Sequence, residues 1–265
     1  MAVSATLRRP MARMCAALLL SAVLVLSGVG AGQADPNALW NIVHNKCVPN
    51  EQQSGKPDPC VAVDLSGGEQ AGYAVLKDLV GATQFLLIPT ARVTGIESPA
   101  VIAPNAPNYF AVAWESRTYV DKVLNRTMPR DDISLAVNSI SGRSQNQLHI
   151  HIDCVRVDVR DALHRYEATI RDHWALFPVP LAGHRYLAMS VEGEQLGQAN
   201  PFKLLADGRP VARADMGDQT LVVVGATLSN GHAGFIVLDD RADPARADKG
   251  SGEDLQDHSC AVARS

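Results

Sequence analysis

Residues 145–154 have the sequence QNQLHIHIDC, in which polar and apolar side chains alternate as they do in a β-strand. A strand here places Gln147, His149, His151 and Asp153 on one face, with Leu148 and the two isoleucines on the other. The apolar face can pack on a core, while the two imidazoles stand about 7 Å apart, a distance of two strand rises. Such a pair suits the binding of a phosphate, the binding of a metal, or a nucleophile with a helper.

The composition is that of a globular protein of one large domain or two small ones. The chain has 265 residues, and 46% of them are hydrophobic, which suffices for a core. The formal net charge of −4 gives no basic surface, so the sequence argues against nucleic-acid binding.

The first 34 residues have the pattern of a leader. Arg8, Arg9 and Arg13 precede an uncharged run from Cys15 to Gly32, and a small-x-small cleavage site ends at Ala34. The run is also close to the ~18 residues that can span a membrane. We therefore expect residues 1–34 to be a signal peptide or an uncleaved membrane anchor, and residues 35–265 to lie outside the cytoplasm.

Export changes the interpretation of the other cysteines. Cys47, Cys60, Cys154 and Cys260 are an even number in an oxidising compartment, where disulfides form. Three pairings are possible, besides four free thiols. Cys47–Cys60 would close a short loop rich in proline, and Cys154–Cys260 would then tie the C-terminus to the end of the histidine strand.

The remaining pattern predicts an α+β protein with an antiparallel sheet and flanking helices. Predicted strands are 72–77, 84–89, 133–137, 145–154, 185–191, 220–227 and 234–238, and predicted helices are 38–44, 108–124, 159–174 and 201–205. The polar tail 241–258 is expected to be loose. Both halves run strand, helix, then hairpin, which suggests an internal duplication whose second copy lacks the histidine pair.

A His-x-His pair alone is more typical of a metal-ligand fragment or of a polar surface than of a catalytic device. Its surroundings favour catalysis, because a helix and a hairpin with Asn138 at its corner precede it. The other histidines, among them His184 and His258, are given structural roles.

The strand resembles the histidine-triad signature, in which three histidines alternate with apolar residues, and the chain is most similar to the bacterial CDP-diacylglycerol pyrophosphatases of that superfamily. The likeness extends over the exported part, through residues 47–50, 72–79, 87–90, 95–99, 155–160, 200–202 and 257–260. It implies a histidine-triad-like fold for residues 35–265. It also selects Gln147, His149 and His151 as the triad positions over His149, His151 and Asp153.

The resemblance further implies hydrolysis of CDP-diacylglycerol to CMP and phosphatidate. His149 is then the nucleophile that carries CMP, and His151 and Gln147 donate to phosphate oxygens. Gln147 stands where the family usually has a histidine, and an amide cannot carry charge or accept a proton as imidazole does. Asn138 is expected to face the nucleotide with help from Gln145, and Lys77 and Arg143 to neutralise the diphosphate.

No metal or other cofactor is expected, since the protein supplies the electrostatics. We expect a monomer acting at the membrane surface, in the periplasm at the inner membrane. Two alternatives stay open: a hydrolase or nucleotidyl transferase acting on a soluble nucleotide, and a non-catalytic module that binds a lipid headgroup or a metal.

Overall fold

Strands of two to nine residues, rich in apolar side chains, pair antiparallel into one open sheet, in the order β1-β2-β3-β5-β4-β8-β9-β7-β6. The computed structural model describes residues 1–2 and 35–264, so nearly all of the predicted leader lies outside the described residues. The strands are β1 Ala62–Asp64, β2 Tyr73–Lys77, β3 Phe85–Pro89, β4 Ile133–Val137, β5 Ile150–Cys154, β6 Ala175–Leu176, β7 Leu187–Glu192, β8 Gln219–Thr227 and β9 Ala233–Arg241. The predicted class, mixed helix and antiparallel sheet, is confirmed.

Helices connect and cover the strands. They are α1 Ala38–Ile42, α2 Val48–Ser54, α3 Tyr109–Ser116, α4 Thr118–Leu124, α5 Val157–Tyr166, α6 Pro201–Gly208 and α7 Pro210–Ala214, and one π-helical turn, Val43–Cys47, joins α1 to α2. Asn108 and Asn200 cap α3 and α6, because their side-chain oxygens accept from Ala111 N and Phe202 N. No helix among the described residues is long and apolar enough to cross a membrane.

The two faces of the sheet pack against two different hydrophobic cores. Ile150 and Ile152 belong to the main core, which includes Phe110 of α3 and Phe202 of α6. On the opposite face, a smaller core joins α1 and α2 to β2 and β3. His151 lies on this second face, because it pairs directly with Leu86 of the smaller core. The predicted alternation therefore holds over β5.

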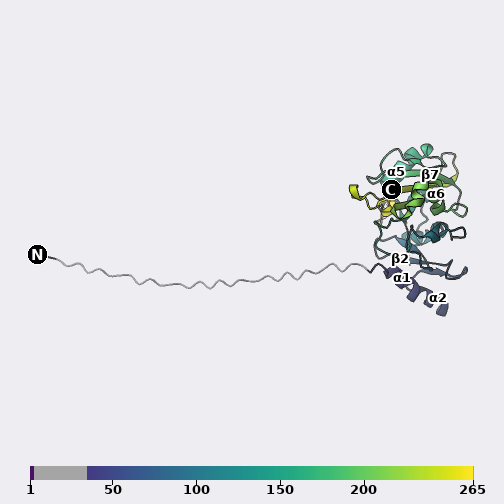
Figure 1. Ribbon diagram of the computed structural model, residues 1–265, viewed down its shortest axis with the longest axis horizontal. Coiled ribbons are helices and arrows are strands. Elements are labelled where there is room, and N and C mark those ends of the chain that lie inside the picture. Colours follow the sequence, from purple (N-terminus) through teal and green to yellow (C-terminus); the bar gives the residue numbers. More distant parts are fainter. Residues whose placement is uncertain (3–34, 265) are drawn as a thin grey trace. The chain divides into compact units, whose positions relative to one another are not determined.

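The succession of strands and helices along the chain repeats. The succession β2-β3-α3-α4-β4-β5 has the same plan as β6-β7-α6-α7-β8-β9, and the two halves join where β4 pairs with β8. In Figure 1 the first half, with β2, lies at one end and the second half, with β7 and α6, at the other. An internal duplication predicts this order, and β9 lacks histidine, as the hypothesis requires.

Three predicted elements differ most from the observed ones. The histidine strand begins only at Ile150, because the preceding residues bond elsewhere: Asn146 N donates to Pro36 O, and Leu148 N donates to Val93 O. The helix expected over 108–124 is two helices that meet at Arg117, whose N–H bonds Trp114 O only three residues back.

The helix expected over 159–174 ends at Tyr166, and a 3₁₀ turn, Glu167–Thr169, follows. Ile170 is then extended, and Trp174 donates its indole N–H to Leu204 O, so these two apolar residues pack outside the helix.

The tail is the largest correction. Residues 248–260, here called the C-terminal segment, are packed rather than loose: Leu255 and Cys260 are fully buried, and Val155 pairs with Gln256. Gly252 lies so close to β4 and β8 that an added Cβ would meet Val222 and Ala136 at 2.9 and 3.1 Å. The disulfides Cys47–Cys60 and Cys154–Cys260 are present, and the second fixes this segment beside β5.

Candidate functional site

His149 and His151 line a cavity of about 490 Å³ on the second face of the sheet, here called the histidine cavity. Its other walls come from α1, from β2 and the turn after it, from residues 138–145 and from Glu253 of the C-terminal segment. The imidazole centroids are 4.8 Å apart and meet edge to face. The rings are therefore closer than the 7 Å expected from two strand rises, and His149 lies just before β5.

His149 has one nitrogen fixed by the main chain. Its Nδ1 lies 2.7 Å from Gln147 O, and a carbonyl oxygen only accepts, so Nδ1 carries the hydrogen. Burial lowers the pKa of His149, although the bond to Gln147 O opposes that shift. At neutral pH the ring is therefore uncharged, with its lone pair on Nε2.

His151 has the reverse arrangement. Its Nδ1 lies 2.7 Å from Gln84 Nε2 and 3.2 Å from Glu253 Oε2, and Gln84 Nε2 lies 3.1 Å from the same carboxylate oxygen. In one tautomer of His151, the Gln84 amide donates one hydrogen to Nδ1 and the other to the carboxylate. The hydrogen of His151 is then on Nε2, which is buried and has no partner among the described residues. Burial, followed by the nearby His149 and His258, lowers the pKa of His151 well below its usual value. A neutral donor that lacks a partner suits an incoming phosphate oxygen.

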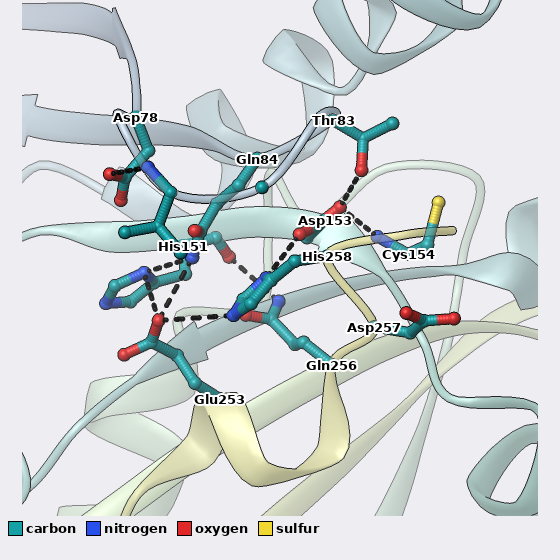
Figure 2. A network of polar contacts seen from close by, with 12 residues as sticks. Asp78, Thr83, Gln84, His151, Asp153, Cys154, Glu253, Gln256, Asp257 and His258 are labelled. Atoms are coloured by element: carbon teal, nitrogen blue, oxygen red, sulfur yellow. Dashed lines mark hydrogen bonds and ion pairs between the residues drawn. The ribbon is translucent and has the colours of Figure 1, made fainter. Parts of the chain in front are cut away.

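The C-terminal segment extends this site with an ionic network, shown in Figure 2. His258 Nδ1 lies 2.7 Å from Asp153 Oδ2, and His258 Nε2 lies 3.8 Å from Glu253 Oε2. The hydrogen bond that His258 donates to Asp153 raises the pKa of His258, against the effect of burial. Asp153 is fully buried and also accepts from Thr83 Oγ1 and Cys154 N. The imidazole of His258 thus lies between the carboxylates of Asp153 and Glu253.

The side-chain amide of Gln147 donates hydrogen bonds to backbone carbonyls of the protein itself. Its Nε2 donates to Pro89 O at 3.0 Å and to Ala91 O at 2.9 Å, which uses both amide hydrogens, and the side chain is fully buried. Contact with a phosphate oxygen would require one of these bonds to break. The bonds hold the end of β3 against the residue whose carbonyl fixes His149.

The predicted substrate-binding residues also have internal partners. Asn138 lines the cavity, donates to Glu253 Oε1 at 2.7 Å and accepts from Gly252 N. Gln145 lines it as well, accepting from Leu39 N and donating to Asp35 O. Both amides therefore build the walls of the cavity, and their contact with a nucleotide stays a prediction.

The two predicted cations differ in position. Lys77 lines the cavity, and its Nζ bonds the carbonyl oxygens of Asp78 and Gly81. Arg143 does not line it and instead forms a two-pronged ion pair with Glu97, at 2.5 and 2.8 Å. Neutralising a diphosphate with Arg143 would require this pair to open.

One group of three side chains in the described part of the chain could hold a metal ion: His184, Asp240 and Asp248. His184 Nδ1 lies 2.6 Å from Asp248 Oδ2, so the histidine helps to anchor the start of the C-terminal segment. Burial and the neighbouring Asp248 raise the pKa of Asp240 to about 7. This group does not include the histidine pair.

The chain matches a known protein family. A family model described as CDP-diacylglycerol pyrophosphatase matches residues 34–264, which is nearly the whole of the described chain. The match includes the histidine pair and the C-terminal segment.

Proposed function

The chain belongs to the CDP-diacylglycerol pyrophosphatase family, hydrolases that cleave the diphosphate of CDP-diacylglycerol, and we propose that it acts through a covalent CMP–His149 intermediate. The observation that supports this route is the hydrogen bond between His149 Nδ1 and Gln147 O. It directs the lone pair to Nε2 of a neutral imidazole that lines the cavity, as a nucleophilic histidine requires.

In the first step, His149 Nε2 attacks the phosphorus attached to cytidine. The nitrogen–phosphorus bond forms, the bond from that phosphorus to the bridging oxygen breaks, and phosphatidate leaves with the electron pair. The histidine ring then carries positive charge, which the carbonyl of Gln147 stabilises through Nδ1–H.

In the second step, water attacks the same phosphorus. The nitrogen–phosphorus bond breaks, CMP leaves, the water proton passes to solvent, and His149 regains its lone pair. His151 donates from Nε2 to a non-bridging oxygen in both steps. Gln84 makes that possible by donating to the other nitrogen of His151.

We also propose that the fold is that of the histidine-triad superfamily, with Gln147, His149 and His151 at the triad positions. The alternation over β5 and the repeated order of the strands support this relation. Here Gln147 is a positioning residue, since its amide hydrogens bond two carbonyls.

The proposed location is the periplasm, at the inner membrane. The two disulfides suggest an oxidising compartment, and the apolar run before residue 34 suggests export. A monomer fits, because β8 of the second half covers the edge of β4 that a single half would leave open.

The test is hydrolysis of CDP-diacylglycerol in detergent micelles with a chelator present, measured as CMP release. His149→Ala should lower kcat by at least ~1,000-fold, as removal of a nucleophile does. His164→Ala removes a half-exposed imidazole of α5 and should stay within twofold of wild type. Retention of a tenth of the activity by His149→Ala would contradict the covalent route.

A further inference from the structure

The turn between β2 and β3 carries two apolar side chains that project into solvent. Leu79 is 101% exposed and Val80 is 60% exposed. The turn itself is held firmly: Val80 N donates to Asp78 Oδ1, Lys77 Nζ bonds two of its carbonyls, and Ala82 N donates to His258 O. Two apolar side chains on an anchored turn thus remain in water at a cost.

These side chains also belong to the histidine cavity. Leu79 and Val80 line it together with Leu76 and with Leu39 and Ile42 of α1. Part of the cavity lining is therefore apolar, and it includes the two exposed side chains of the turn. The polar groups His149, His151 and Glu253 line the same cavity.

The size of the cavity decides which part of the substrate it can hold. About 490 Å³ suits a ligand of drug size, such as a nucleotide headgroup. An acyl chain spans about half of the ~30 Å hydrocarbon core of a bilayer, and the substrate has two such chains. The chains therefore stay in the bilayer, and the enzyme must reach the diphosphate at the level of the headgroups.

We propose that Leu79 and Val80 insert into the phospholipid bilayer and so seat the mouth of the histidine cavity on the lipid headgroups. The inference rests on the proposed substrate, a lipid that resides in a bilayer. Burial of each side chain should favour association by roughly ten- to a hundredfold.

The first experiment compares two substrates with the full chain. One is CDP-diacylglycerol in phosphatidylcholine vesicles, and the other is its short-chain analogue, dissolved as monomers. The variant Leu79→Ser/Val80→Ser should lose at least tenfold more kcat/KM on vesicles than on the monomeric substrate. Leu176→Ser is the matched control, because Leu176 is 50% exposed on β6, at the sheet edge opposite β1. It should not alter the ratio.

The second experiment does not depend on hydrolysis. Tryptophan is placed at position 79 or at position 176, and the full chain is mixed with phosphatidylcholine vesicles whose acyl chains carry bromine, which quenches tryptophan on contact. Emission above the parent protein should be quenched for Leu79→Trp and unchanged for Leu176→Trp.

The outcomes separate this inference from the proposed function. Equal loss on both substrates, or no quenching at position 79, overturns the insertion of the turn. Absence of CMP release by the wild type overturns the proposed function, while quenching at position 79 would still support insertion.

Discussion

The Cys154–Cys260 disulfide should contribute more stability than Cys47–Cys60, and its loss should lower turnover more than the loss of Cys47–Cys60. The two bridges span 106 and 13 residues. The chain-entropy relation for loop closure gives about 4.8 kcal/mol for the longer loop and about 2.9 kcal/mol for the shorter one. The difference of about 2 kcal/mol is large enough to measure.

Turnover should separate the two bridges further. The longer bridge fixes Cys260, two residues from His258 and seven from Glu253, both of which stand behind His151. Without it, the C-terminal segment can leave the sheet while the rest of the fold persists. The shorter bridge links the residue before α2 to the residues before β1, and its removal leaves the C-terminal segment in place.

The assay is urea unfolding of the variants Cys154→Ala/Cys260→Ala and Cys47→Ala/Cys60→Ala, with CMP release measured under conditions in which both stay folded. The first variant should be the less stable and the less active. Equal stability losses, or full turnover in the first variant, would refute this account of the C-terminal segment.

Four further predictions concern single groups. In urea unfolding at neutral pH, Gln147→Glu should destabilise the fold more than Gln147→Ala, because a carboxylate would face the carbonyl oxygens of Pro89 and Ala91. Alanine only leaves these oxygens unpaired, at a cost of about 1–3 kcal/mol. The reverse order of stability would contradict this prediction. The pH profile of kcat/KM should have its acid limb below about 6.5, because burial lowers the pKa of His149 and the neutral ring is the nucleophile; a limb above 7 would argue against it. The stabilisation that His258 gains from Asp153 should be complete below about pH 6.5 and should be lost as the pH rises through the raised pKa of His258. The free energy of unfolding of His258→Gln should therefore change less with pH above about 6.5 than that of the wild type, and an equal pH dependence of the two would contradict this contribution. Asp240, whose pKa is raised to about 7, binds its proton more tightly in the folded state, so its contribution to stability should fall from about pH 4 to about pH 7. Asp240→Asn should remove that part of the pH dependence, and an unchanged pH dependence in Asp240→Asn would contradict the prediction.

The sheet could be predicted because its information is local. Alternation or continuous apolar runs mark the strands, and the caps at Asn108 and Asn200 mark two helix starts. The helix over 159–174 extends too far in the prediction because Ile170 and Trp174 continue its apolar stripe, although tertiary contacts direct them elsewhere. Periodicity shows that a residue is buried and does not show against which element.

The site could be predicted only in part, since half of it comes from a segment without periodicity. The histidine pair was evident from the sequence, whereas Gln84, Glu253 and the role of His258 were missed. One signal was available: with Cys154 bonded to Cys260, His258 must lie near Asp153, the neighbour of Cys154. Applying that constraint along the tail would have brought His258 to the site.

Capture of the covalent intermediate tests the central claim most directly. CDP-diacylglycerol labelled at the phosphorus attached to cytidine is mixed with enzyme, quenched in alkali within one turnover, and digested for mass spectrometry. CMP should be found on His149 and should be absent from His149→Ala. Label on His151, or CMP release at full rate with no protein-bound label at any time, would contradict the account.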